Sequence, residues 1–358
     1  MKIAALILLV TLWSAPHVRA EEKLAGGPYV VNVGERSATV VWILERGQAS
    51  LGVEPDKPEK SGPVLRAEKV TFSGLKPGTT YYYNATGTEQ GKGSFKTAPR
   101  GASTFQFVVY GDTRTRHDVH RQVIGAVLKH TSPDLILHTG DLVANGADAS
   151  LWPIFFDVER DLLRKVAFFP ALGNHERNDR SFYDFFDLST TPYYSFDWGT
   201  CHFIVLDSDI TNVSKSETAR EAFWSAQVRW LEEDLQKSQS ADFRFVSAHH
   251  PPVTAVERRQ GDNPHMTALM PMFEKYKVTA GFFGHDHNYQ HYLKNGVHYF
   301  TTGGGGAPLY DVDKPPEGIT KRVARTENFV VVNVKEKTAR VEAFKPDGQI
   351  LETTELTP

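Results

Sequence analysis

The feature that most constrains this chain is an apolar run that ends in polar residues, and it occurs five times. Residues 134–141 read DLILHTGD, which predicts a buried strand that stops at a glycine and is followed by a carboxylate. The runs at 105–110, 166–172, 243–248 and 278–283 are likewise followed by Asp, Asn or His, after a glycine in every case except 243–248. The polar residues that follow the five runs are Asp112, Asp141, Asn174, His249, His285 and His287. Because open α/β sheets bind ligands outside the carboxyl ends of their strands, the five runs predict one shared site.

Composition sets the size of the fold and excludes some partners. A chain of 358 residues with 40% hydrophobic content is long enough for a large core and for two domains. Its formal net charge of −3 gives no general attraction to nucleic acid or to an anionic membrane, so we expect no nucleic-acid partner. The single cysteine, Cys201, cannot form an internal disulfide, and we interpret it as a small core residue.

The first 20 residues have the pattern of a secretory signal peptide. Lys2 supplies the positive start, residues 4–13 the apolar middle, and Val18-Arg19-Ala20 a small-residue cleavage site. The alternative is a membrane anchor, but this apolar stretch is shorter than the ~20 residues that a span needs. The sequence therefore predicts an exported protein, periplasmic or secreted, with no membrane span.

Residues 21–99 predict an all-β domain. β-branched and aromatic runs, such as those at 29–31 and 38–42, are separated by Gly- and Pro-containing breaks. The run from Leu75 to Tyr81, LKPGTTY, resembles part of a fibronectin type III β-sandwich. Another small β module is the alternative. No catalytic cluster is visible here, so we expect this domain to act as a spacer or to contact proteins or surfaces.

From residue 104 onward the pattern changes to strands that alternate with helices, which predicts an α/β domain over 104–350. Helices are expected to begin at caps provided by Asp118 and Ser150, and a third helix is expected over 219–236.

The six polar residues at the strand ends offer hard oxygen and borderline nitrogen donors. Such a set suits divalent first-row metals or iron(III). Two metals roughly 3.5–4 Å apart can hold a bridging hydroxide and clamp both oxygens of an in-line displacement. Because two carboxylates offset only part of the charge on two metals, the remaining positive charge would attract a phosphate ester.

The order of the motifs resembles that of the calcineurin-like metallophosphoesterases. The five motifs are Gly111-Asp112, Gly140-Asp141, Gly173-Asn174-His175-Glu176, Val246 to His249, and Gly284-His285-Asp286-His287. Together with the β domain in front, they are most similar to the purple acid phosphatase branch. The resemblance implies a four-layer αββα sandwich over residues 104–350. It also implies an exported binuclear-metal phosphoesterase in which a metal-bound hydroxide attacks small-molecule phosphate monoesters, while phosphodiesters stay open as substrates.

The resemblance also implies a role for each site residue. Asp141 would bridge both metals, Asp112 and His287 would hold the first metal, and Asn174, His249 and His285 would hold the second. His175 and His265 would contact substrate and act as catalytic residues, and Arg114 and His250 would bind substrate. For Arg114 and His265, an ordinary surface position is the alternative.

Two positions depart from the family pattern. Purple acid phosphatases carry a tyrosine ligand three positions after the second Asp, and here that position is Ala144. Losing this anionic donor favours a divalent pair such as zinc, manganese or iron, and it predicts a colourless protein. The wider family also carries Asp-x-His in its first motif, where this chain has Asp112-Thr113-Arg114. Water, His117 or His120 could fill the missing place.

A second hypothesis is a non-catalytic exported binding or adhesion protein. In that case the β domain would bind the partner, and the metal domain would be an inactive scaffold. A decayed site usually loses ligands, and the presence of all six motif ligands argues against this hypothesis.

Overall fold

A computed structural model describes residues 22–101, 104–189 and 191–358. The predicted signal peptide, residues 1–20, lies outside the described residues. Within the described part of the chain, no helix is both long enough and apolar enough to cross a membrane.

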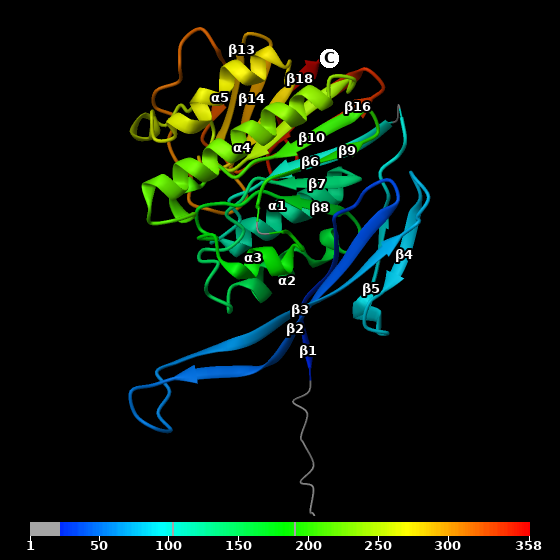
Figure 1. The fold of residues 1–358 in the computed structure, drawn as a ribbon, viewed down its shortest axis with the longest axis vertical. Coiled ribbons are helices and arrows are strands. Elements are labelled where there is room, and N and C mark those ends of the chain that lie inside the picture. Colours follow the sequence, from blue (N-terminus) through cyan, green and yellow to red (C-terminus); the bar gives the residue numbers. More distant parts are fainter. Residues whose placement is uncertain (1–21, 102–103, 190) are drawn as a thin grey trace, which may run out of the picture.

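The body of the molecule consists of two β-sheets that lie face to face, with helices on both outer sides (Figure 1). The larger sheet has nine strands in the order β18-β17-β16-β6-β7-β8-β1-β2-β3, and the second has seven in the order β15-β13-β14-β12-β11-β10-β9. The strands of the nine-stranded sheet are β1 (Lys23–Val31), β2 (Ser37–Leu51), β3 (Lys60–Ser73), β6 (Thr104–Tyr110), β7 (Leu135–His138), β8 (Ala167–Pro170), β16 (Phe329–Lys335), β17 (Thr338–Phe344) and β18 (Ile350–Leu356). Those of the seven-stranded sheet are β9 (Tyr194–Trp198), β10 (Cys201–Val205), β11 (Phe243–Ala248), β12 (Ala280–Phe283), β13 (Tyr289–Lys294), β14 (Val297–Thr302) and β15 (Thr320–Ala324).

Three hydrophobic cores separate the four layers. The central core lies between the sheets and is rich in aromatic rings, including Phe107, Phe203 and Phe282. A second core packs the outer face of the larger sheet against the helices α1 (His117–His130), α2 (Trp152–Leu163) and α3 (Arg180–Phe185). A third packs the smaller sheet against α4 (Glu217–Lys237) and α5 (Pro264–Lys275). The predicted four-layer αββα sandwich is confirmed.

Two of the predicted helix caps are wrong. Helix α1 begins at His117 after Arg116, so Asp118 lies in its first turn, where a carboxylate favours the positive end of the helix dipole. Helix α2 begins after Leu151, because the Ser150 hydroxyl instead donates to Asp148 Oδ1 at 2.6 Å. Helix α4 contains the predicted residues 219–236 and is capped by Ser216.

The N-terminal region is all β, as predicted. It comprises β1, β2, β3 and a two-stranded sheet of β4 (Thr80–Asn84) and β5 (Lys92–Lys96). The Tyr81 hydroxyl accepts a hydrogen bond from the Lys76 N–H at 2.9 Å, which fixes the predicted turn before β4. Strand β1 also pairs in parallel with β8 at Val30 and Ala167, so the larger sheet continues across the predicted domain boundary. The boundary at residues 99–104 and the fibronectin type III likeness stay predictions.

The outer half of the β2–β3 hairpin extends away from the body (Figure 1). Its end carries two exposed apolar side chains, Leu51 and Val53, which are 71% and 85% exposed.

Candidate metal centre

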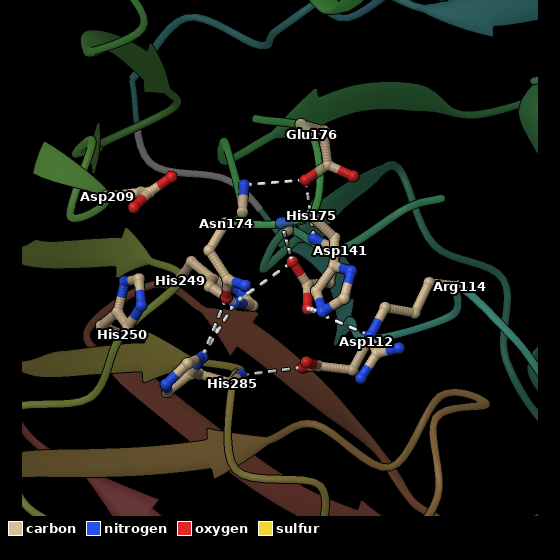
Figure 2. Close-up of polar contacts among 12 residues, drawn as sticks. Asp112, Arg114, Asp141, Asn174, His175, Glu176, Asp209, His249, His250 and His285 are labelled. Atoms are coloured by element: carbon tan, nitrogen blue, oxygen red, sulfur yellow. Dashed lines mark hydrogen bonds and ion pairs between the residues drawn. The ribbon is translucent and has the colours of Figure 1, made fainter. Parts of the chain in front are cut away.

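The predicted site residues meet where the strands of both sheets end. Strands β6, β7 and β8 of one sheet and β11 and β12 of the other stop just before the polar motifs. Three of these residues, Asp112, Asp141 and His285, have φ angles of 59°, 56° and 67°. This left-handed backbone turns the chain sharply after each strand. The side chains consequently form one cluster. Figure 2 shows its members pointing toward one another, namely Asp112, Asp141, Asn174, His249 and His285.

One group of donors consists of Asp112, Asp141 and His287. Their candidate ligand atoms all lie within 4.8 Å of one another, and all three residues are buried. His287 Nε2 is 3.4 Å from Asp112 Oδ1. That oxygen is buried and has no hydrogen-bond partner among the described residues, which is costly for a carboxylate unless a cation binds there.

The second group consists of Asn174, His249 and His285. Asn174 Oδ1 lies 3.0 Å from His249 Nε2 and 3.1 Å from His285 Nδ1, and these two nitrogens are 3.2 Å apart. Asp141 Oδ1 is 3.4 Å from His249 Nε2, so Asp141 lies between the two groups. A carboxylate in this position can bridge two cations.

The two buried histidine ligands are oriented by the backbone. His249 Nδ1 donates to the carbonyl of Thr139 at 2.8 Å, and His287 Nδ1 donates to that of Pro308 at 2.7 Å. Each bond leaves the lone pair of Nε2 directed into the cluster, which is how metal-binding histidines are commonly held. Oxygen and imidazole donors in this arrangement fit two first-row divalent cations.

Electrostatics around the cluster also favour bound cations. Burial opposes the charged form of Asp112, but the neighbouring His287, His249 and Arg114 hold the pKa of Asp112 below its usual value. Burial lowers the pKa of His249, yet Asp141 and Asp112 outweigh it and leave that pKa raised. The same negative field would stabilise a metal ion.

Glu176 holds the loop that carries Asp141. Its carboxylate accepts the backbone N–H groups of Gly173, Asp141, Leu142 and Val143 at 2.8–3.2 Å. Burial and the neighbouring Asp141 raise the pKa of Glu176 to about 8, against the effect of these backbone donors. The residue therefore positions Asp141, as expected of a group behind the ligands.

The run of glycines at 303–306 allows the backbone to lie against the site. A Cβ at Gly303 would collide with the backbone of Asp286 and the carboxylate of Asp112, and one at Gly305 would collide with the carbonyl of Gly111. The run thus allows the backbone to pack closely against the donors.

The residues predicted to contact substrate lie around the cluster, at different distances from it. His175 donates from Nδ1 to the carbonyl of Ala144 at 2.8 Å, its Nε2 is 3.9 Å from Asp141 Oδ2, and its side chain is 30% exposed. Arg114 Nε is 3.3 Å from Asp141 Oδ2. His250 groups with His249 and His285 as a possible third donor, although its Nδ1 is 2.9 Å from the Ser208 hydroxyl.

His265 is the most remote of the predicted substrate residues. Its Nε2 lies 3.3 Å from Glu221, and its ring packs against Trp224. It lines a cavity that also reaches Asn174 and His285. The catalytic and substrate-binding roles of these residues stay predictions.

His120 does not supply the ligand that the first metal lacks. That residue is buried between α1 and α2, where its Nε2 bonds to Glu159 at 2.7 Å. The His120 ring therefore belongs to the core. His138 is also fully buried, and this burial lowers its pKa to about 3.

Sequence reasoning missed two residues beside the centre. Arg259 contacts His285 Nε2, and its Nε lies 3.6 Å from Asp286 Oδ1. Tyr310 stacks on His287 with ring centroids 4.1 Å apart, and the guanidinium of Arg259 lies over the Tyr310 ring at 4.9 Å. Neither residue belongs to a motif, and the doublet Arg258-Arg259 soon after His250 was the only available signal.

Comparison with known proteins agrees with this geometry. The family model described as calcineurin-like phosphoesterase matches residues 105–289, just over half of the chain. Acid phosphatase type 7 of Homo sapiens is 23% identical over 294 residues, which cover 70% of this chain and 65% of that protein. Purple acid phosphatase 15 of Arabidopsis thaliana is 26% identical over 270 residues, covering 62% of this chain and 48% of that protein. The chain therefore spans less than two thirds of both relatives.

Solved structures show the same fold. The purple acid phosphatase PPD1 from yellow lupin (Lupinus luteus) seeds superposes with a TM-score of 0.68 at 16% identity, covering 92% of this chain and 73% of that one. PhoD superposes with a TM-score of 0.65 at 13% identity, covering 95% and 94%. The resemblance to the purple acid phosphatase branch is confirmed, and the chain belongs to the calcineurin-like phosphoesterase family.

Proposed function

We propose that this chain is an exported phosphatase that hydrolyses phosphate monoesters at a pair of divalent metal ions. The observation that carries the proposal is the convergence of two donor groups on Asp141. Asp112 and His287 lie on one side of Asp141, and Asn174, His249 and His285 lie on the other. In this assignment the first set holds one ion, the second set holds the other, and Asp141 bridges them.

A bound metal pair would supply an activated water as nucleophile and would neutralise charge on the phosphoryl oxygens. The remaining tasks fall to this chain's own residues. Arg114 presents a planar guanidinium, which suits the oxygens of a phosphate. In its imidazolium form, with the Nδ1 proton held by the Ala144 carbonyl, His175 can give its Nε2 proton to the departing alkoxide. Glu176 and Thr139 hold Asp141 and His249 in place while this happens.

The metals proposed are zinc, manganese or iron in the divalent state. The proposed ligand set contains two carboxylates, those of Asp112 and Asp141, and position 144 is an alanine instead of a tyrosine ligand. The positive Arg114 also lies beside the bridging carboxylate. Each of these features disfavours an ion of higher charge. A protein loaded in this way is expected to be colourless.

Monoesters are proposed as substrates because the relatives are named as acid phosphatases. Export is proposed because residues 1–20 have the form of a secretory signal. The exposed end of the β2–β3 hairpin is the part of the N-terminal region that we propose for protein or surface contacts.

The test is hydrolysis by metal-stripped protein before and after zinc or manganese is restored. A nitrophenyl monoester and the corresponding diester are assayed side by side at equal concentration. We expect activity only after metal is restored, with the monoester hydrolysed faster. A faster rate on the diester would make the chain a phosphodiesterase of the same fold. No hydrolysis of either ester by metal-replete protein would favour the non-catalytic binding protein.

A further inference from the structure

A cavity of about 490 Å³ opens directly from one side of the metal centre. Asn174 and His285 form its inner wall, and the first turns of α4, the loop around Asp209 and the start of α5 form the rest. The cavity begins at two of the proposed metal ligands, so a phosphate bound at the centre would direct its alcohol group into it. This argument rests on the proposed function.

Acidic side chains dominate the wall of this cavity. Four carboxylates line it, namely Asp209, Glu217, Glu221 and Asp262, together with the guanidinium of Arg220 and the imidazoles of His250, His265 and His285. His265 Nε2 lies 3.3 Å from Glu221, so one of the four carboxylates has a nearby partner. Part of the donor capacity of Arg220 is already used, because its Nη1 donates to the carbonyls of Ser214 and Lys215 at 3.1 and 3.2 Å.

The deepest of these carboxylates is Asp209, which is only 2% exposed. It accepts hydrogen bonds from the Thr211 hydroxyl at 2.7 Å and from the Asn212 amide at 2.6 Å. A carboxylate can accept about four hydrogen bonds, so Asp209 keeps capacity for a donor in the cavity. No cationic side chain among the described residues is paired with it by an ion pair.

The two ends of the centre therefore differ in charge. Figure 2 shows Arg114 on one side of Asp141 and Asp209 on the opposite side, beyond Asn174. A substrate that fits both ends has a phosphate near Arg114 and hydrogen-bond donors or positive charge near Asp209.

We propose that this cavity selects zwitterionic phosphate monoesters, in which a small alcohol carries an ammonium group. Uncharged hydroxylated alcohols are expected to be intermediate. Esters with a second anionic group are disfavoured, because that group would face Asp209 and the two glutamates of α4.

The experiment compares three small esters of similar size on the metal-replete full chain: 2-aminoethyl phosphate, 2-hydroxyethyl phosphate and phosphoglycolate. The quantity measured is the ratio of kcat/KM for the ammonium ester to that for the carboxylate ester. The double variant E217Q/E221Q removes two charges from the cavity wall. The control is E233Q, the same type of substitution at one exposed position of α4 away from the cavity. Comparing ratios between proteins cancels the different intrinsic reactivity of the esters.

We expect a wild-type ratio of about ten or more, and a fall of about fivefold in E217Q/E221Q with no change in E233Q. Higher salt should lower the wild-type ratio, because Glu217 and Glu221 are exposed. Hydrolysis of all three esters with the same ratio in all three proteins would overturn this inference and leave the phosphatase intact. Absence of hydrolysis for every ester, including the nitrophenyl monoester, would overturn the proposed function itself.

Discussion

Two clusters of histidine and carboxylate lie at opposite ends of β10 and β11. At the carboxyl ends, the metal centre contains buried polar atoms without a hydrogen-bond partner among the described residues, including Asp112 Oδ1, Thr139 Oγ1 and Arg114 Nε. Near the start of β10, both ring nitrogens of His202 are paired, one with Asp197 and one with Asp234, each at 2.7 Å. Residue types are similar in the two places, but hydrogen bonding is complete only in the second.

This difference separates residues kept for a ligand from residues that stabilise the fold. Unpaired buried groups cost free energy, so the centre is expected to gain stability when cations bind. The His202 cluster is already satisfied and has no need of a ligand. Substitutions in the two clusters should therefore give opposite patterns of activity and stability.

The largest effect is expected from loss of a donor at the metal centre. In His249→Ala or Asn174→Ala, turnover of a nitrophenyl monoester should fall on the order of 10³-fold or more, because the metals contribute several kcal/mol to the reaction. Metal-free stability should change little or rise, as measured by denaturant unfolding. Wild-type turnover by either variant in a metal-replete assay would show that the donor cluster is not the catalytic centre.

A smaller loss is expected from Arg114. Arg114→Ala should raise KM for the monoester by about 10- to 100-fold, because a charge-assisted bond to phosphate is lost. Arg114→Lys should recover only part of this, since an ammonium cannot present a planar fork. Steady-state kinetics on both variants is the check, and a KM equal to wild type in both would place Arg114 outside the substrate site.

The His202 cluster should affect stability and its pH dependence instead. Burial lowers the pKa of His202, but hydrogen bonds to Asp197 and Asp234 outweigh it and raise that pKa to about 9. A raised folded-state pKa stabilises fully below pH ~6.5, and the contribution is lost as pH rises through about 9. Most of the effect should come from Asp234, which is 16% exposed, because Asp197 is 73% exposed.

His202→Gln should therefore lower the free energy of unfolding by about 2 kcal/mol at pH 6, with the difference shrinking between pH 6.5 and 9. Activity per folded molecule should stay at the wild-type level. His130→Gln, at an exposed position, is the control. A deficit that is constant with pH would show that the His202 charge is not the cause.

The smallest change in turnover is expected at Ala144. Iron-loaded wild-type protein should show no strong visible absorbance, whereas Ala144→Tyr should gain a band from a tyrosinate–iron bond. Ala144→Phe, which lacks the hydroxyl, is the matched control. A strong band in the wild-type protein would refute the prediction of a divalent, colourless centre.

Local patterns in the sequence predicted the α/β domain and the cluster of donors, through apolar runs at strand length and polar residues placed directly after them. The four-layer arrangement was implied by the family resemblance of the motifs. Asp112 and His287 are 175 positions apart, yet Asp112 follows β6 and His287 follows β12, and the two facing sheets bring the ends of these strands together.

Other contacts were beyond the reach of sequence patterns. The pairing of β1 with β8 joins strands more than 130 residues apart and depends on how the N-terminal region docks. Arg259 and Tyr310 reach the centre from loops, where no periodicity indicates direction. The predicted cap Ser150 failed because its hydroxyl bonds to a nearby aspartate, a competition that helix signals do not reveal.

The most direct test of the central claim is the number of metal ions bound per chain. The mature protein is purified from its native compartment and compared with His249→Ala by elemental analysis. The account predicts two divalent ions per wild-type chain and at most one in the variant. Wild-type protein that is folded, exposed to zinc, manganese and iron, and still binds no metal would contradict it.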